Sequence, residues 1–171
     1  MLELTTKRLR IIPLDKRNLE FAITDFNKME KALGLKITDK NIGPREREVF
    51  RIRLRGVKFN ESQYMWYTVW AIVLQEENRI IGHAMLKGAP NDKGEVIIGY
   101  YMQEPYRGNG YMKEAASEII SWIFENQEVK YVVADTVKDN NISQRLLKDL
   151  GMELYNEDKE CYWWRLKNSN H

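Results

Sequence analysis

One stretch of the sequence, residues 94–117, constrains the fold most strongly, because three different local patterns follow one another within it. Residues 95–102 are rich in β-branched and aromatic side chains, which is typical of a strand. Next comes the loop sequence RGNG at residues 107–110, and its two glycines let the backbone approach a ligand closely. From Tyr111 onward, apolar residues recur at helical spacing. The stretch therefore predicts a strand, a glycine loop and a helix.

The glycine loop lies where an anion site is expected. The first N–H groups of a helix have no partner inside the helix, and the positive end of the helix dipole lies at the same place. A glycine loop leading into the helix lets these N–H groups converge on a negatively charged group. We therefore expect a phosphorylated ligand to bind here.

Two common nucleotide-binding motifs do not fit this loop. A P-loop ends in Gly-Lys-Ser/Thr, whereas Gly110 is followed by Tyr111 and Met112. The dinucleotide fingerprint needs a third small residue where Lys113 stands, and it needs an all-parallel context that the preceding hairpins deny. Both motifs are excluded.

Composition indicates a globular protein with a single domain, residues 1–171. Apolar residues make up 43% and charged residues 30% of the chain, and the net charge of +2 is too small to indicate nucleic-acid binding. The single Cys161 excludes an internal disulfide framework and favours a reducing compartment. No apolar run approaches the ~18 residues of a membrane span, and the first six residues lack the apolar core of a signal peptide. We expect a cytoplasmic protein without a membrane anchor, and the His and Cys spacing predicts no metal site.

The remaining segments alternate between strand and helix patterns. The expected strands are residues 9–14, 66–74, 79–86, 95–102, 131–137, 152–155 and 161–166. The expected helices are residues 15–34, 44–55, 111–126 and 141–150. The three strands from residue 66 to residue 102 are joined by short polar turns and are expected to pair antiparallel. This order predicts an α+β domain with a mixed, mostly antiparallel central sheet flanked by helices.

The helix expected at residues 44–55 carries Arg47, Arg51 and Arg55 on one face. These arginines are interpreted either as a solvated helix face or as a basic wall that steers an acidic acceptor. A weaker third interpretation is a nucleic-acid contact. Residues 50–54 also alternate with period two, which is a strand pattern.

Two blocks of the sequence resemble one family. YRGNGYMKEA, at residues 106–115, resembles the pyrophosphate loop of the GNAT superfamily of acyl-CoA-dependent N-acetyltransferases, with its pattern Arg/Gln-x-x-Gly-x-Gly/Ala. Residues 140–151 are similar to the Asn-x-x-Ser helix of that family, which closes in Leu-Gly-Phe. LTTKRLRIIPLD near the start and IIGYYM later resemble the branch that contains ribosomal-protein N-terminal alanine acetyltransferases. The resemblance covers nearly the whole chain and is weakest across residues 30–65.

The resemblance implies a GNAT-like fold and an enzyme that moves an acetyl group from acetyl-CoA to a primary amine by direct attack in a ternary complex. The amine is a protein N-terminus or a small amine such as a polyamine or an antibiotic. The family pattern also implies which residues bind the coenzyme. The implied set is Met102 and Gln103 for pantetheine and the thioester, Gly108, Asn109, Gly110, Tyr111 and Met112 for the diphosphate, Arg107 for added charge, and Asn140 and Ser143 for the pantetheine arm.

The catalytic residues are less constrained by the sequence. Ser143 is a candidate to protonate the leaving thiolate, or it only caps its helix beside Asn140. Tyr155 is the rival general acid, with a packing role as its alternative. Glu95 and His83 are candidates for the general base, and a proton relay through water is the third possibility.

Three positions depart from the family pattern. Met112 replaces a small residue, so the loop must accommodate its side chain or turn it into the core, and Met152 replaces the usual Phe. Ile97 stands where this branch often carries a Glu. These departures motivate a second hypothesis, a catalytically silent CoA-binding sensor or partner-binding module. The expected oligomeric state is a monomer or a homodimer.

Overall fold

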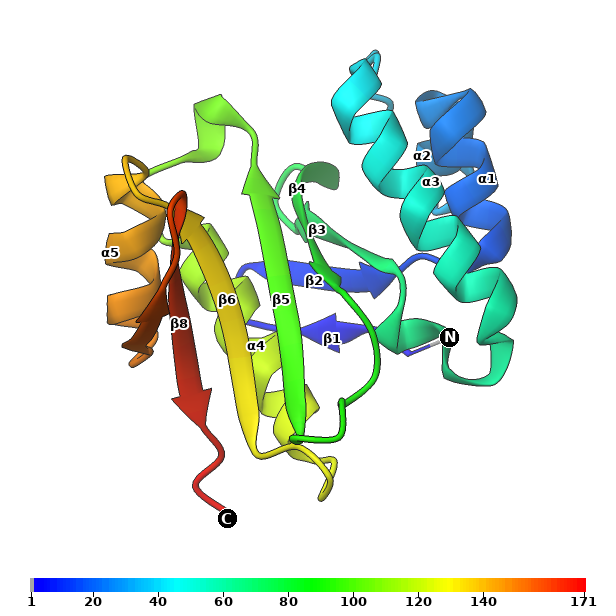
Figure 1. Cartoon of the computed structure of the whole chain (residues 1–171). Helices are drawn as coiled ribbons and strands as arrows, with labels where there is room; N and C mark the ends of the chain where they lie inside the picture. Colours follow the sequence, from blue (N-terminus) through cyan, green and yellow to red (C-terminus); the bar gives the residue numbers. More distant parts are fainter. Residues whose placement is uncertain (1) are drawn as a thin grey trace.

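A computed structural model describes residues 2–171, and the strands form one sheet with helices on both faces (Figure 1). The strands are β1 (Leu4–Thr5), β2 (Leu9–Pro13), β3 (Val69–Leu74), β4 (Arg79–Leu86), β5 (Glu95–Met102), β6 (Tyr131–Val137), β7 (Glu153–Glu157) and β8 (Cys161–Lys167). The helices are α1 (Lys16–Thr24), α2 (Phe26–Ala32), α3 (Pro44–Phe59), α4 (Tyr111–Phe124) and α5 (Asn141–Asp149), with 3-10 helices η1 (Glu61–Trp66) and η2 (Glu104–Tyr106). The α+β class is confirmed.

The sheet is mixed and mostly antiparallel, as expected. Its strand order is β1-β2-β3-β4-β5-β6-β8-β7. Every pair of neighbours is antiparallel except β5 and β6, which are parallel because α4 connects them. This parallel pair lies in the middle of the sheet.

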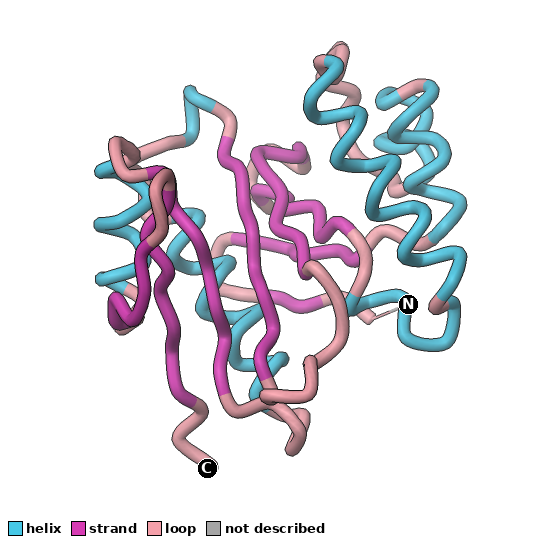
Figure 2. Tube along the Cα trace, in the orientation of Figure 1, coloured by secondary structure: helices cyan, strands magenta, loops and turns pink. Residues whose placement is uncertain are grey.

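The parallel pair β5–β6 is joined over only a short length. Their register runs from Glu95 opposite Tyr131 to Ile97 opposite Val133 and ends there. Beyond this point β5 continues to pair with β4 as far as Met102, and β6 continues to pair with β8. The two strands therefore diverge, and Figure 2 shows the gap that opens between them. The sheet consists of two halves that are joined at one end and separated at the other.

The helices cover the two faces of the sheet unequally (Figure 1). On the face covered by α4 and α5, Trp70, Ile119 and Leu147 belong to one buried core. On the other face, α1, α2 and α3 lie over the β2–β4 part, where Phe50 and Ala71 belong to a second core. Burial of these apolar side chains holds each helix layer to the sheet.

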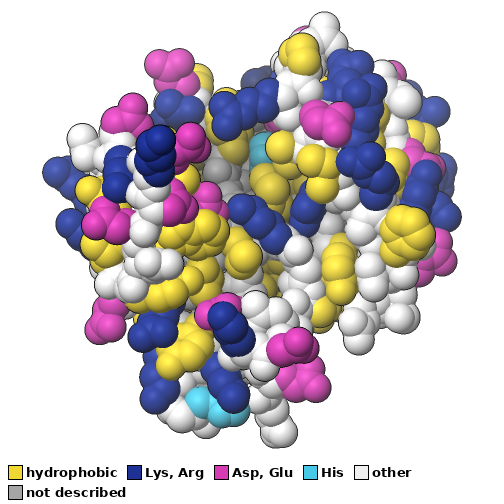
Figure 3. Space-filling view, viewed as in Figure 1, with side chains coloured by type: hydrophobic (Ala, Val, Ile, Leu, Met, Phe, Trp, Pro, Cys, Tyr) yellow, Lys and Arg dark blue, Asp and Glu magenta, His cyan; other side chains and the backbone are white. Residues whose placement is uncertain are grey.

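The second face of β5 and β6 is left open. Tyr101 is 41% exposed and Val137 is 53% exposed, while Ile97 and Asp135 are half-buried on the same face. Figure 3 shows a hollow between the part that carries α1–α3 and the part that carries β6 and β8, with hydrophobic and basic side chains on its walls. The gap between β5 and β6 thus faces helices on one side and an open surface on the other.

Some expected element boundaries are wrong. The helix expected at residues 15–34 is two helices, because Asp25 has extended backbone (φ −154°) and its carboxylate accepts the N–H of Lys28 as the N-cap of α2. The strand expected from Trp66 begins at Val69, since residues 61–66 form η1 and the Trp66 ring packs against Trp122. α3 continues to Phe59, beyond the expected end at residue 55. The two-residue strand β1 was not expected.

Gly94 supports the joined end of β5 and β6, which makes it sensitive to substitution. Its φ is +73°, its carbonyl accepts the N–H groups of Lys130 and Tyr131, and an added Cβ would lie 2.7 Å from the Glu128 carbonyl oxygen. We expect Gly94→Ala to lower the free energy of unfolding by more than Gly34→Ala, measured by urea denaturation. Gly34 has a similar φ of +70° but open space around it, so its substitution isolates backbone strain of about 1 kcal/mol. Equal losses would show that the contact with Glu128 does not matter.

Candidate active site

The glycine loop lies between η2 and α4 and exposes unpaired backbone donors. Gly108 and Gly110 both have φ +77°, a conformation that favours glycine, and Gly110 is the N-cap of α4. Within residues 2–171 no side chain caps this helix, and no backbone carbonyl accepts the N–H groups of residues 108–112. Residues 107–110 are exposed. These N–H groups and the helix dipole fit a diphosphate.

The gap between β5 and β6 exposes a second set of backbone groups. The N–H of Gln103 donates to the Ile81 carbonyl, and the Ile97 carbonyl accepts the N–H of Lys87, so these alternate residues of the β5 segment face β4. Because backbone groups alternate in direction along a strand, those of Tyr100 and Met102 face the gap. The expected pantetheine-binding residue Met102 therefore faces the gap, whereas Gln103 faces away from it.

The exposed Arg107 side chain turns back from the loop toward the end of β5. Its Nε donates to the Met102 carbonyl at 2.9 Å, and its guanidinium lies 5.8 Å from the centre of the Tyr101 ring. Its charge therefore lies at the end of β5. Met112, the other unusual loop residue, is only 8% exposed and packs in the core beneath α4. Its longer side chain leaves the backbone N–H groups of the loop unobstructed.

Two hydroxyl groups meet across the gap. Asn140 is the N-cap of α5 and accepts the N–H of Ser143 at 3.1 Å. Asn140 therefore caps the helix, and the Ser143 hydroxyl instead lies 2.6 Å from the Tyr100 hydroxyl. The contact joins α5 to β5 where β5 and β6 have separated. Ser143 is thus part of a hydroxyl pair, and the capping alternative applies to Asn140.

The Tyr100 phenol is protonated at neutral pH. Burial raises the pKa of its phenol, the hydrogen bond with Ser143 opposes this, and the negative charge of Asp135 raises the pKa further, with a net increase. A protonated phenol beside a serine hydroxyl is suited to donate a proton to a developing anion. Sequence reasoning did not identify Tyr100, although it lies directly after Gly99 in the central strand.

Tyr155 and Glu95 lie away from this pair. Tyr155 is on β7, three strands from β5, and its ring lies 4.9 Å from the Arg165 guanidinium. Burial, and then the nearby charge of Glu95, raises the pKa of Tyr155. Glu95 is the first residue of β5, about 23 Å along the strand from Met102, and its carboxylate accepts the side-chain N–H of Asn91. The structure does not bring Ser143, Tyr155 and Glu95 together.

His83 is buried between the sheet and α3. Its ring packs against Phe50 and Tyr101, and burial together with the charge of Lys40 lowers its pKa from 6.5 to about 3. A Glu46 oxygen lies 3.8 Å from Nδ1, which would favour the charged form, but Lys40 holds the same oxygen at 2.8 Å. The positive charge of Lys40 thus offsets the negative charge of Glu46, and burial is the main cause of the lowered pKa of His83. His83 is uncharged at neutral pH and is too weak a base to be an efficient proton acceptor there.

Asp135 is an acidic group at the gap that sequence reasoning missed. It lies two residues after the last β6 residue paired with β5, and its carboxylate is 3.1 Å from Lys87 Nζ. The sequence did contain a signal for Asp135, because a charged residue within the apolar strand at residues 131–137 is unusual and points to a specific role.

The arginine face expected on α3 is not uniformly basic. Glu48 lies 3.7 Å from both Arg51 and Arg55, and Arg47 donates to the Ile42 carbonyl.

No group of three or more His, Cys, Asp or Glu side chains that could hold a metal ion occurs among residues 2–171. In the same part of the chain, no helix has the length and apolar character needed to cross a membrane.

Comparisons with known proteins concern the family and the fold of the chain. Residues 8–153 match the family model described as the acetyltransferase (GNAT) domain. The uncharacterized N-acetyltransferase YjdG of Bacillus subtilis is 28% identical over 171 residues, which cover 96% of this chain and 97% of the relative. The uncharacterized N-acetyltransferase YnaD of the same organism is 26% identical over 98 residues, 54% of this chain and 57% of that protein.

Solved structures share the fold over the whole chain. The ribosomal-protein-S5-alanine acetyltransferase from Vibrio fischeri has a TM-score of 0.73 at 16% identity, covering 99% of this chain and 98% of its own. RimL, a ribosomal L7/L12 α-N-protein acetyltransferase in complex with coenzyme A, has a TM-score of 0.72 at 13% identity, covering 99% and 100%. At these identities the likeness concerns the fold alone.

The fold, with its sheet divided between β5 and β6, is that of solved N-acetyltransferases. The chain belongs to the GNAT family of acetyltransferases, because the family model matches most of its length. It is an acetyl-CoA-dependent N-acetyltransferase, and the family resemblance seen in its sequence is confirmed.

Buried neutral His83 predicts a pH dependence of stability. The unfolded chain binds a proton at His83 near pH 6.5, whereas the folded chain does so only near pH 3. The unfolded state therefore binds more protons between these values, and stability falls as the pH is lowered. We expect this residue to contribute a loss of about 2 kcal/mol between pH 7 and pH 5.

Urea denaturation of the wild type and of His83→Gln at both pH values measures this contribution. The variant carries no titrating ring, so its stability is expected to decline less steeply than that of the wild type. Parallel declines in the two proteins would mean that His83 is protonated in the folded state.

Proposed function

We propose that the protein transfers the acetyl group of acetyl-CoA to a primary amine, a protein N-terminus or a small amine, by direct attack within a ternary complex. One observation carries the proposal: within residues 2–171, backbone groups of Tyr100 and Met102 that face the gap have no partner on β6, and the Tyr100–Ser143 hydroxyl pair lies across the gap. Thioester and amine can then meet in the gap from opposite faces of the sheet.

The residues of the described chain fit the coenzyme along its length. The backbone N–H groups of residues 108–112 would hold the diphosphate, since they have no acceptor within residues 2–171 and residues 108–110 are exposed. The backbone groups of Tyr100 and the N–H of Met102 would bind the amides of pantetheine as a neighbouring strand does, while the Met102 carbonyl accepts Arg107. Asn140 and Ser143 would lie beside the pantetheine arm from the other side of the gap.

The chemistry then requires few groups. A neutral amine attacks the thioester carbonyl carbon, a C–N bond forms, and the negative charge that develops on the oxygen needs an N–H donor such as that of Met102. The C–S bond then breaks, and the thiolate takes a proton from the Tyr100–Ser143 pair, which regains it from water. The amine nitrogen loses its proton to water, because neither Glu95 nor His83 is suited to accept it.

The open face of the gap suits the acceptor. Asp135 offers a carboxylate to an approaching ammonium, and Lys87 partly neutralises it, so that the amine is not held too tightly to lose its proton. Tyr101 forms an exposed aromatic surface beside it. These groups recognise an amine without selecting between a peptide terminus and a small amine.

A second candidate is a CoA-binding sensor or partner-binding module without turnover. Ile97 favours it, because an apolar side chain occupies the open face at the point where β5 and β6 separate. In such a protein the coenzyme would bind in the same gap, and the acceptor face would serve only as a contact surface.

A panel of amines with acetyl-CoA distinguishes the two candidates. The panel contains peptides with free N-termini, polyamines and aminoglycosides, and mass spectrometry detects products heavier by one acetyl group. We expect CoA-dependent acetylation of at least one member and a higher melting temperature with CoA. Binding without any product would favour the silent module, and the absence of both would reject the proposal.

Gly108→Asp is the control for this assay. It places a carboxylate among the loop N–H groups. An added Cβ at Gly108 has no atom within 4 Å, so the destabilisation is limited to backbone strain of about 1 kcal/mol at φ +77°, and the protein is expected to fold. The variant is expected to lose both the thermal shift and the acetylation. A folded Gly108→Asp protein that still binds CoA would locate the diphosphate elsewhere.

The hydroxyl pair predicts a specific kinetic effect. If the pair protonates the departing thiolate, Ser143→Ala and Tyr100→Phe are each expected to lower kcat by roughly 10²-fold with little change in the KM for acetyl-CoA. The effect falls on kcat because the hydrogen bond strengthens mainly in the transition state. Steady-state kinetics on the best amine of the panel measures it.

Tyr155→Phe and Asn140→Ala serve as comparisons. Tyr155→Phe removes the rival hydroxyl and is expected to leave kcat near normal, since Tyr155 lies three strands from β5. Asn140→Ala removes the cap and is expected to cost about 1 kcal/mol of stability. A slow Tyr155→Phe with a normal Ser143→Ala would transfer the role to Tyr155.

A further inference from the structure

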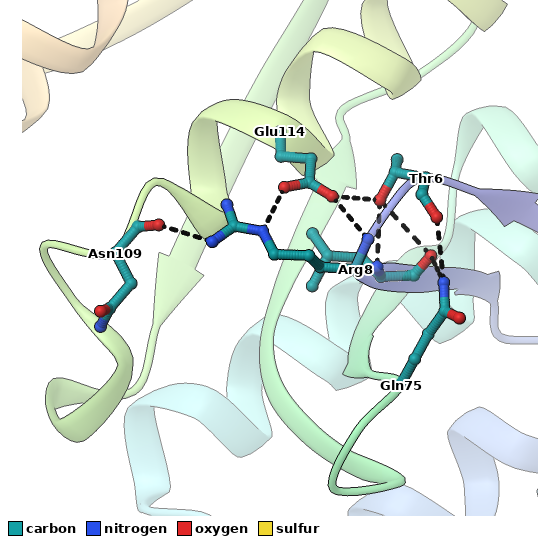
Figure 4. A network of polar contacts seen from close by, with 6 residues as sticks. Thr6, Arg8, Gln75, Asn109 and Glu114 are labelled. Atoms are coloured by element: carbon teal, nitrogen blue, oxygen red, sulfur yellow. Dashed lines mark hydrogen bonds and ion pairs between the residues drawn. The ribbon is translucent and has the colours of Figure 1, made fainter.

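Arg8 reaches the glycine loop from a distant part of the chain. It lies in the turn between β1 and β2, and Figure 4 shows its side chain extended along the first turn of α4. Its Nη1 donates to the Asn109 carbonyl at 3.0 Å, across a separation of 101 residues. Arg8 was not among the residues expected to take part in the site.

Glu114 in the first turn of α4 fixes the position of Arg8. One carboxylate oxygen accepts the Thr6 hydroxyl at 2.6 Å and the Arg8 backbone N–H at 2.9 Å. The other oxygen accepts Arg8 Nε at 2.7 Å. The guanidinium also lies over the Tyr111 ring, with Cζ 4.4 Å from the ring centre. Arg8 is therefore held on several sides, and little of its own conformational freedom is left to lose.

The contact with Asn109 determines the direction of a loop N–H group. The Asn109–Gly110 peptide is trans, so its C=O and its N–H point in opposite directions. Since the carbonyl is directed at Arg8, the N–H of Gly110 is directed away from Arg8. Glycines at 108 and 110 leave the intervening backbone free to rotate, and the hydrogen bond from Arg8 restrains it.

We propose that Arg8 is a positioning residue for the diphosphate of the coenzyme: it anchors the Asn109 carbonyl and thereby directs the Gly110 N–H toward the phosphate. This inference rests on the proposed coenzyme site. It assigns the segment before β2 a part in binding, because Thr6 and Glu114 hold Arg8 in place. Arg8 orders the loop before the coenzyme binds, so that the coenzyme does not have to order it.

Arg8→Lys and Arg8→Gln test the inference, with the dissociation constant measured by calorimetry for CoA and the KM measured for acetyl-CoA and acetyl-pantetheine. Lysine keeps the positive charge but lacks the planar fork that joins Glu114 to Asn109. We expect both variants to bind CoA about tenfold more weakly or worse. The KM for acetyl-pantetheine, which lacks the diphosphate, and kcat at saturating acetyl-CoA are expected to remain within about twofold.

Gln75→Leu is the control for general disturbance of the same turn. The Gln75 amide donates to the carbonyls of Thr6 and Leu9 without touching the glycine loop. Its loss is expected to lower stability while leaving the affinity for CoA unchanged. Urea denaturation of all variants confirms that they are folded under the assay conditions.

Three outcomes would overturn the inference. Normal CoA affinity in both Arg8 variants would show that the loop does not depend on Arg8. Restored affinity in Arg8→Lys alone would show that positive charge, and not the direction of the peptide, is what matters. Equal weakening of acetyl-CoA and acetyl-pantetheine would reduce Arg8 to a structural role. A wild-type protein that binds no CoA would instead reject the proposed function, and the inference with it.

Discussion

The separation of β5 from β6 beyond Ile97 is the constraint on which the site depends. Backbone groups inside a sheet normally pair with a neighbouring strand, yet those of Tyr100 and Met102 face a gap. The fold tolerates this because, beyond Ile97, β5 stays paired with β4 from Ile98 to Met102, and β6 is paired with β8 along its whole length, so that each half of the sheet keeps one hydrogen-bonded neighbour. Apart from the Met102 carbonyl, which accepts Arg107, these groups are suited to a ligand that carries its own amides, as pantetheine does.

The two halves of the sheet remain aligned because other contacts span the gap. α4 and α5 share one core with strands from both halves, and the Tyr100–Ser143 contact joins β5 to α5 directly. At the far end of β5, the N-terminal turn reaches the glycine loop through Arg8. Three segments that are distant in the sequence therefore set the geometry of one binding surface, and each uses a few hydrogen bonds to do so.

Much of the fold could be predicted because it follows from local patterns. The strand at residues 95–102, the glycine loop and the helix from Tyr111 lie where their spacing indicates, and Asn140 caps α5 as its position suggests. The single helix expected at residues 15–34 from its apolar spacing is two helices, because Asp25 within it acts as the N-cap of α2. Glu95 and His83 are candidate bases on chemical grounds, and only the structure shows that Glu95 lies at the far end of β5 from Met102 and that His83 is buried and uncharged at neutral pH.

The sequence by itself determined the local backbone: where strands end, where glycine permits a left-handed turn, and which helix presents free N–H groups to an anion. It determined the family as well, since these local patterns are what the family shares. Only the tertiary structure decided that Ser143 meets Tyr100 and that Arg8 meets Asn109. The reason is physical, because local propensities act between near neighbours, whereas these contacts depend on strand register and helix packing between residues 43 and 101 positions apart.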